Sequence, residues 1–457
     1  MRILVVASDH VGSSMAGPGI RYLWFARELA RRGHEVTLVV PFETDLAEDG
    51  FAVRVDNPWH AGRMTRLARA HDAVVAQRLP VPTMLALARS PTRAVYDLYA
   101  PLTIEHAALA SRRDRPAGAS FELDELTLRV ALETGDAFVC AGERQRDLWL
   151  GALAALGRVD PETYRRDPSF RSLVAVAPFG VDPDPPAAGA RVLKGVVPGI
   201  AETDAVALWG GGVWEWLDPL TVIRAVHLLA RDDLKLYFLG TRSPNPAVPA
   251  MTMQRRAREL AAELGLAGRT VFFNDGWVPY ETRGAYLLEA DVGVSAHFDE
   301  LETRFAFRNR LLDCVWAGLP IVTTEGDELA ELVRARGLGR AVPPEDAESY
   351  AAALAAVLDS GRSAFAAAAA EARRGLAWPA AVAPLAALVA GARSPAGASP
   401  RPARLLRYAA LRGRAALDAR GAGGTAARLA AGVVRRARGE LAARPPAAER
   451  REDEPLR

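Results

Sequence analysis

The sequence is nearly devoid of lysine. Of its 57 basic residues, only Lys194 and Lys235 are lysines, and the rest are arginines. A cationic side chain that holds a phosphate in this protein will therefore be an arginine, whose planar guanidinium can donate two parallel hydrogen bonds. The net charge is only +2, which argues against nucleic-acid binding by the chain as a whole.

Cysteine is equally scarce, and metal-binding patterns are missing. Cys140 and Cys314 lie in apolar contexts without a CxxC motif or a histidine at ligand spacing. A disulfide framework is excluded, and buried structural thiols are expected. The one DxD, from Asp182 to Asp184, lies among prolines, where a turn explains it better than a metal site. We therefore expect no metal and no cofactor.

Long apolar segments are also lacking. The N-terminal MRILVVASDH does not have the extended apolar run of a signal peptide, and the run 380–392 is too short to span a bilayer and contains Pro384. We expect a cytoplasmic protein. Neither GxGxxG nor GxxxxGK[ST] occurs, so a dinucleotide fingerprint and a Walker loop are not predicted.

What the chain does have is a regular alternation of buried strands and helical segments. Its 457 residues suit two domains and an extra piece. A Pro/Ala/Gly-rich linker over 183–198 separates two such series, so we predict an α/β protein with two doubly wound domains of parallel strands. The strand candidates are ILVVAS, VTLVV, DAVVAQ, RAVYDL, DAFVCAG and LVAVAPFGVD before the linker, and AVALWGG, LKLYFLG, TVFFND, VGVSAH and LPIVTT after it.

The first strand is followed by a glycine-rich loop, GSSMAGPGIRY. Gly17 and Gly19 would let the backbone approach a ligand, and the amides at the start of the next helix could hold a phosphate. A flexible connection between strand and helix explains the same residues equally well.

The stretch 296–325 concentrates acids, arginines and a buried strand. Its RFAFRNRLLDCVWAG run predicts a helix that ends at Gly318, followed by the strand LPIVTT. Because ligands of such sheets bind at the carboxyl ends of the strands, the polar residues on either side should face one cleft. Asp97, Tyr99 and Glu105 follow the RAVYDL strand and should face it too, although Asp97 could equally serve a cap or a turn.

Beyond Gly391 the composition changes. Residues 401–444 carry eleven arginines against Asp418 and Glu440, interleaved with leucine and alanine. A basic amphipathic segment of this kind could lie on an anionic membrane surface. A solvated extension is the alternative.

Together these segments resemble the family 4 retaining glycosyltransferases, whose GT-B fold consists of two facing Rossmann-like domains. The resemblance rests on ARELARRGHEVTLVV, VAPFGVD, GWVPYETRGAYLLEADVGVSAH and LLDCVWAGLPIVTTEGDELAELV. It implies an acceptor-side domain over 1–185, a nucleotide-sugar-binding domain over 186–375, a crossing helix over 376–392 that packs back on the first domain, and an extra basic tail over 393–457.

The resemblance also gives roles to residues, with two departures. The second acid of the family's paired-glutamate motif, which holds the ribose, falls on Asp313, whereas the first falls on Phe305. Glu300 and Glu302 are the nearest carboxylates. The family's phosphate-binding Arg and Lys fall on Gly212 and Leu217, which carry no charge. The substitutes that the sequence offers are Arg304, Arg308 and Arg310.

The predicted site therefore contains no metal and three groups of residues. The catalytic group is Asp97, Glu302 and Arg308; the donor-binding group is Gly17, Gly19, Gly211, Gly212, Trp214, Trp277, Arg304, Arg310 and Asp313; the acceptor-side group is Arg21, Tyr22 and Glu105. Trp214 and Trp216 could wall the sugar site or pack in the core, and His106 is a weaker acceptor-side candidate.

The activity that the resemblance implies is transfer of a sugar, with retention, from a nucleoside diphosphate donor to a carbohydrate or lipid-linked acceptor, as in cell-envelope or polysaccharide synthesis. The expected partners are this donor and acceptor and, through the tail, an anionic membrane surface; nucleic acid is not expected. Two alternatives remain open. A noncatalytic GT-B activator or scaffold is favoured by the missing charges, and a nucleotide-sugar epimerase shares the fold.

Overall fold

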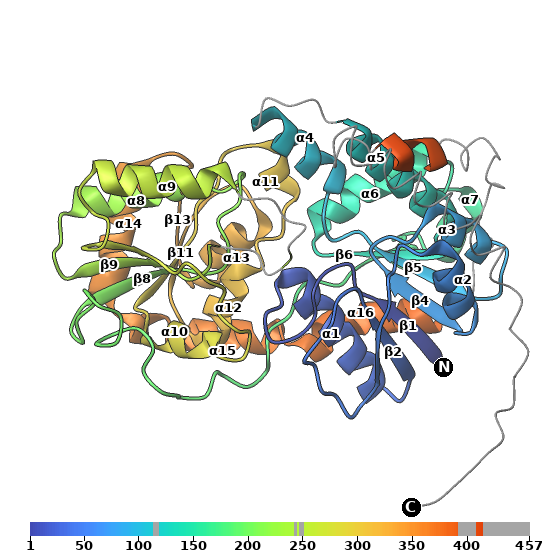
Figure 1. The fold of residues 1–457 in the computed structure, drawn as a ribbon, viewed down its shortest axis with the longest axis horizontal. Coiled ribbons are helices and arrows are strands. Elements are labelled where there is room, and N and C mark those ends of the chain that lie inside the picture. Colours follow the sequence, from blue (N-terminus) through green and yellow to red (C-terminus); the bar gives the residue numbers. More distant parts are fainter. Residues whose placement is uncertain (113–117, 242–244, 246–250, 392–407, 415–457) are drawn as a thin grey trace, which may run out of the picture.

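A computed structural model describes residues 1–112, 118–241, 245, 251–391 and 408–414. Two α/β domains lie side by side, and the last long helix, which follows the helices of the second domain in the chain, lies along the first domain (Figure 1). One cluster of buried apolar residues continues from the first domain into the second, with members such as Val5, Leu208 and Leu311. The two domains therefore share a continuous apolar contact.

The first domain is built on a seven-stranded parallel sheet of order β3-β2-β1-β4-β5-β6-β7. Successive residues of its central strand β1 point to opposite faces, so Ile3 belongs to one buried cluster and Leu4 to the other. The strands are β1 (Arg2–Val6), β2 (Glu35–Val40), β3 (Ala52–Val55), β4 (Ala73–Ala76), β5 (Arg93–Asp97), β6 (Ala137–Cys140) and β7 (Val174–Val176).

Helices cover both faces of this sheet, as parallel strands require. They are α1 (Gly17–Arg31), α2 (Ala61–Arg69), α3 (Val81–Leu87), α4 (Leu102–Arg112), α5 (Gly118–Thr134), α6 (Glu143–Ala155) and α7 (Pro161–Arg166).

The second domain repeats the arrangement with a six-stranded parallel sheet of order β10-β9-β8-β11-β12-β13. Its strands are β8 (Ala205–Trp209), β9 (Leu234–Phe238), β10 (Val271–Phe273), β11 (Val292–Val294), β12 (Ile321–Thr324) and β13 (Gly339–Val342). Its helices are α8 (Pro219–Leu229), α9 (Thr252–Glu263), α10 (Arg283–Glu289), α11 (Leu301–Phe305), α12 (Arg310–Ala317), α13 (Glu328–Arg336), α14 (Ala347–Ser360), the 3-10 helix η1 (Arg362–Phe365) and α15 (Ala366–Gly375).

The predicted α/β fold with two doubly wound domains is confirmed, with local differences. Every predicted strand is present, but sequence analysis missed the short edge strands β3 and β13. Most residues of β3 are exposed, so the strand lacks the apolar signal of its neighbours. The helix predicted to run from Phe305 to Gly318 is also interrupted. It begins only at Arg310, because the chain is extended at Ala306, whereas its left-handed C-cap at Gly318 is as predicted.

The crossing helix α16 (Trp378–Ala390) packs against α1 of the first domain. Its Trp378 is almost fully buried and stacks on Trp24 with ring centroids 5.5 Å apart. A Cβ at Gly180 would lie 2.7 Å from the Trp378 ring, so this glycine permits the close approach. Because the preceding helix α15 packs on α12 of the second domain, the passage from α15 to α16 fastens the second domain to the first.

The tail is described only over 408–414, a short helical segment beside α5 (Figure 1). Its Tyr408 and Leu411 are buried in a first-domain cluster. The rest of the predicted membrane-binding stretch 401–444 lies outside the described residues. Within the described part of the chain, no helix is long and apolar enough to cross a membrane.

Candidate active site

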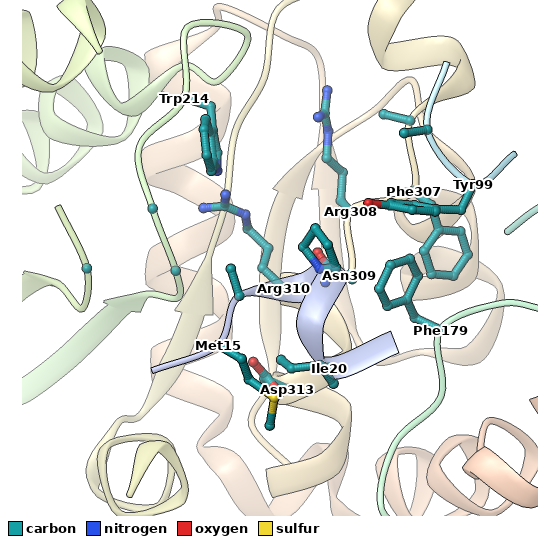
Figure 2. Close-up of a pocket in the computed structure, with 18 of the residues that line it drawn as sticks. Met15, Ile20, Tyr99, Phe179, Trp214, Phe307, Arg308, Asn309, Arg310 and Asp313 are labelled. Carbon is teal, nitrogen blue, oxygen red and sulfur yellow. The ribbon is translucent and has the colours of Figure 1, made fainter. Parts of the chain in front are cut away.

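A cavity lies between the two domains, where loops at the carboxyl ends of both sheets meet (Figure 2). The first domain contributes the loop before α1 and the segment after β5, and the second contributes the loops after β8 and β9 and the turn before α12. Of the predicted site residues, the cavity wall includes Gly17, Glu105, Gly211, Gly212, Trp214, Trp277, Glu302, Arg308, Arg310 and Asp313.

Arg310 occupies the position where the cavity meets the glycine loop 210–212. Its Nη1 donates a 2.9 Å hydrogen bond to the Gly210 carbonyl, and its guanidinium lies 5.5 Å from the Trp209 ring. Gly211 has a φ of +76°, a left-handed conformation that only glycine adopts readily. The loop can therefore turn its backbone toward a ligand directly beside a cation.

Arg310 is the cavity cation without an acidic partner. The other two arginines of the wall form ion pairs, Arg308 with Glu302 and Arg283 with Asp313, whereas no described carboxylate pairs with Arg310. Burial, followed by the neighbouring charge of Arg308, lowers the pKa of Arg310 to about 9. It remains charged at neutral pH, and an anion bound beside it would relieve this unfavourable environment.

Arg308 and Glu302 form a buried, two-pronged ion pair. Nη2 and Nη1 of Arg308 lie 2.5 Å and 3.1 Å from the two Glu302 carboxylate oxygens, and both side chains are almost fully buried. The sequence placed Arg308 on the helix that carries Asp313. This is corrected, because Arg308 lies in the extended segment before α12 and turns back toward α11. Its charge is therefore largely neutralised by Glu302.

Asp313 faces the cavity from α12 and is held by an arginine that sequence analysis did not identify. Nε of Arg283 donates to Oδ1 of Asp313 at 3.1 Å. The Arg283 guanidinium lies 3.6 Å from the Tyr280 ring and 4.4 Å from the Trp316 ring. This clamp fixes the orientation of the Asp313 carboxylate and leaves its second oxygen available to hydroxyl donors.

Aromatic rings wall both sides of the cavity. Trp214 and Trp216 stack in parallel with centroids 5.6 Å apart, and both line the cavity while also packing against the apolar core of the second domain. Figure 2 shows the Arg310 guanidinium directed toward Trp214. Across the cleft, Phe179 of the first domain stacks on Phe307 of the second at 5.8 Å. Flat apolar walls of this kind suit the faces of a nucleobase or a sugar ring.

Glu105 reaches the cavity from the first turn of α4 in the first domain. Burial, reinforced by the charge of Glu302, raises its pKa to about 7, although Arg308 acts in the opposite direction. A carboxyl group with such a pKa can accept and return a proton near neutral pH. The adjacent His106 does not line the cavity. Its Nδ1 lies 3.0 Å from Oδ2 of Asp124 instead.

The prediction that Asp97, Arg21 and Tyr22 face the cleft is corrected. Asp97 receives 2.7 Å and 2.9 Å hydrogen bonds from Arg21, and both side chains are fully buried. Rings of Phe25 and Phe179 flank the Arg21 guanidinium at 4.5 Å and 4.8 Å. Tyr22 is also fully buried. Asp97 and Arg21 therefore form an internal ion pair. Neither of them lines the cavity, and Tyr22 does not line it either.

Two further expectations change, those for Arg304 and Gly19. Arg304 is exposed on α11 and does not line the cavity. Gly19 is needed for local packing, because a Cβ there would lie 2.1 Å from the His10 carbonyl oxygen. Leu217, at the position of the family's lysine, is completely buried. Gly17 does line the cavity, and a Cβ there would approach Asn309 of the other domain to 2.4 Å.

The predicted turn at Asp182 is present, since its Oδ1 accepts a 3.0 Å hydrogen bond from the Asp184 amide. Among the residues that the structure describes, no group of three or more His, Cys, Asp or Glu side chains is arranged to hold a metal ion. The cationic side chains among the described residues of the cavity wall are Arg283, Arg308 and Arg310.

Comparison with known proteins agrees with the resemblance seen in the sequence. Residues 206–360 match the family model of the glycosyl transferases group 1. No curated protein matches the chain by sequence.

Solved structures of similar fold are GT-B glycosyltransferases. Sucrose-phosphate synthase from Thermosynechococcus elongatus is 16% identical, with a TM-score of 0.60 over 85% of this chain and 98% of its own. WaaG, a glycosyltransferase involved in lipopolysaccharide biosynthesis, is 18% identical, with a TM-score of 0.54 over 85% and 100%. HepE from Anabaena, in complex with UDP-glucose, is 14% identical, with a TM-score of 0.58 over 83% and 97%. These similarities establish the GT-B fold.

Proposed function

We propose that this chain, a GT-B protein whose residues 206–360 match the glycosyl transferases group 1, moves a sugar from a nucleoside diphosphate donor to a carbohydrate or lipid-linked acceptor with retention at the anomeric carbon. The observation that carries the proposal is the cavity between the domains, where the unpaired cation Arg310 lies beside the glycine loop 210–212. A diphosphate placed there would meet both a guanidinium and an exposed backbone.

The donor would lie along the second domain. Arg310 and the backbone around Gly211 and Gly212 would hold the diphosphate and stabilise the negative charge that develops as it leaves. Asp313, oriented by Arg283, would accept hydrogen bonds from the ribose hydroxyls. Trp214 and Trp277 line the same side of the cavity and offer their ring faces to the base or the sugar.

The acceptor would enter from the first domain, where Glu105 faces the cavity. In the reaction, the bond between the anomeric carbon and the diphosphate oxygen breaks and a bond to the acceptor oxygen forms. Glu105 would orient the acceptor hydroxyl and take its proton, a role for which its pKa of about 7 is suited. The charge on the departing diphosphate would be met by arginine without a metal ion, so EDTA should leave transfer unchanged.

A setting in cell-envelope or polysaccharide synthesis, at the inner face of a membrane, is part of this proposal. Its support is that WaaG, which shares the fold, is involved in lipopolysaccharide biosynthesis, and that the stretch 401–444 is rich in arginine. The relative HepE was solved with UDP-glucose, which makes uridine nucleotides the first donors to test.

Thermal unfolding with a panel of UDP-, ADP- and GDP-sugars tests the proposal. A donor present at 100 times its Kd should stabilise the folded protein by about 2.7 kcal/mol. The matching donor should then support transfer to a sugar acceptor, and NMR of the product should show the donor's anomeric configuration. If every nucleotide leaves the Tm unchanged at millimolar concentration, the proposed function is wrong.

A noncatalytic GT-B scaffold is the second candidate. The positions that the resemblance aligns with the family's lysine and first acid are the uncharged Leu217, which is completely buried, and Phe305, which does not line the cavity. Donor binding without hydrolysis or transfer would favour this candidate.

A further inference from the structure

A buried polar cluster lies behind the Arg308–Glu302 ion pair and connects it to the turn that follows β12. The cluster consists of His297, Asp327 and Arg308. His297 and Asp327 are completely buried, and Arg308 is 6% exposed. The sequence motifs and the proposed chemistry give no role to His297 or Asp327.

Three buried polar atoms of this cluster face one another without a hydrogen-bond partner in the described protein. They are Nδ1 of His297, Oδ2 of Asp327 and Nε of Arg308. Oδ2 of Asp327 lies 4.0 Å from Nδ1 of His297 and 3.8 Å from Nε of Arg308. Buried polar atoms without partners are costly, so a small movement of Asp327 toward either neighbour would be favourable.

The hydrogen bonds of His297 decide which neighbour Asp327 can join. Nε2 of His297 lies 3.1 Å from the Glu325 carbonyl oxygen, which can only accept, so Nε2 carries the proton and Nδ1 is an acceptor. Burial and the charge of Arg308 lower the pKa of His297 to about 3, so the ring stays neutral. When Asp327 is ionised, it cannot form a hydrogen bond with Nδ1 of His297, because neither atom carries a proton. Nε of Arg308, in contrast, is a charged donor.

The backbone around Asp327 is fixed from both sides. Its other oxygen, Oδ1, caps α13 by accepting a 2.7 Å hydrogen bond from the Ala330 amide. Gly326 has a φ of +129°, and a Cβ there would lie 3.1 Å from Thr303. From the first domain, Arg144 donates from its amide to Glu328 at 2.6 Å and from Nη1 to the Gly326 carbonyl at 2.5 Å. Contact between the domains therefore holds the turn that carries Asp327.

We propose that Asp327 is a positioning residue whose ionised carboxylate binds Nε of Arg308 and so aims the Arg308–Glu302 pair into the cavity. Arg308 then donates from Nε to Asp327 and from Nη1 and Nη2 to Glu302. Glu302 lines the cavity together with Glu105. When Asp327 is protonated, its hydroxyl instead donates to Nδ1 of His297, and Arg308 loses this support. The inference rests on the proposed function only for its kinetic consequence.

Asp327→Asn is the informative variant. The asparagine keeps the cap through its amide oxygen, while its NH2 group donates to His297 and repels the N–H of Arg308, as the protonated acid would. Asp346→Asn is the matched control, because Asp346 caps α14 by accepting a 2.9 Å hydrogen bond from the Ser349 amide and does not line the cavity.

Crystal structures of the wild-type protein and both variants at neutral pH test the placement without any need for activity. In the wild type and in D346N, Arg308 Nε should bind Asp327 directly or through one water. In D327N, the guanidinium should leave this position and its bonds to Glu302 should change. If Arg308 occupies the same place in all three structures, the proposal is wrong.

Kinetics then test the effect of Asp327 on turnover. Sugar transfer by the wild-type protein must be seen first, and its absence would contradict the proposed function rather than the position of Arg308. D327N should lower kcat at least tenfold with the KM for the donor within threefold, and D346N should change neither. Burial raises the pKa of Asp327 to about 6, against the lowering effect of Arg308 and Arg144. Below that pH, log kcat should therefore fall more steeply for the wild type, through Glu105 and Asp327, than for D327N, in which only Glu105 titrates. Equal slopes and equal kcat values would overturn the positioning role.

Discussion

Replacing Arg310 by glutamine removes the arginine that, among the described residues of the cavity wall, has no acidic partner. Glutamine is neutral and ends at the position of Nε, so the change removes the charge together with the Nη1 hydrogen bond to the Gly210 carbonyl. At about 4 Å and an effective dielectric constant of about 20, a cation and a phosphate charge interact by about 4 kcal/mol. Part of this is offset because Arg310 is itself half-buried, and hydrogen bonds to charged groups contribute about 1.5–3 kcal/mol in practice.

A loss of about 2 kcal/mol in the free energy of binding corresponds to a Kd about 30-fold higher. Isothermal titration calorimetry with the nucleoside diphosphate of the best donor measures it. Arg304→Gln is the matched control, because Arg304 lies six residues earlier but is exposed outside the cavity. Equal affinities for R310Q and the wild type, or a larger loss in R304Q, would refute the phosphate role of Arg310.

Three further predictions concern the wall of the cavity and the crossing helix. Arg308→Ala should lower the free energy of unfolding by about 3–5 kcal/mol, because it leaves the buried Glu302 unpaired; denaturant titration should show that E302Q/R308A is less destabilised than R308A. The raised pKa of Glu105, about 7, means that the folded state binds its proton more tightly than the unfolded state, so this group destabilises the protein increasingly as pH rises from about 4.5 to 7. Thermal unfolding should accordingly show E105Q gaining about 1–3 kcal/mol on the wild type between these pH values, and a constant difference would contradict the raised pKa. Trp378→Ala should cost about 3–5 kcal/mol, because it leaves a cavity against Trp24, and a variant with unchanged stability would show that the crossing helix does not fasten the domains.

The fold was predictable from the sequence because parallel sheets have a strong local signal. Inner strands such as β1 and β4 are buried on both faces and read as apolar runs, whereas β3 is exposed at an edge and carries no such signal. The capping glycine at Gly318 was also predictable, since the left-handed conformation favours this residue.

The start of α12 was not predictable, because a contact with the other domain determines it. Apolar spacing continues smoothly through Phe305 and Phe307, yet Phe307 leaves the helix to stack on Phe179, more than a hundred residues earlier. The break turns Arg308 back onto Glu302 and leaves Arg310 at the cavity. Periodicity within one segment contains no information about such a partner.

The candidate site was predictable in its location and only partly in its members. The sequence correctly placed Asp97 at the end of a strand, but its carboxylate turns inward to Arg21 because α1 presents a buried guanidinium there. Arg283 was missed for the same reason, as its pairing with Asp313 joins residues 30 positions apart. Of the three arginines that were interchangeable in the sequence, burial and pairing leave Arg310 as the available cation.

A crystal structure with the nucleoside diphosphate that gives the largest thermal shift tests the central claim most directly. The account predicts a diphosphate between the glycine loop 210–212 and the guanidinium of Arg310, with the ribose on Asp313. A nucleotide bound elsewhere, or in this cavity with its phosphates turned away from Arg310, would contradict it.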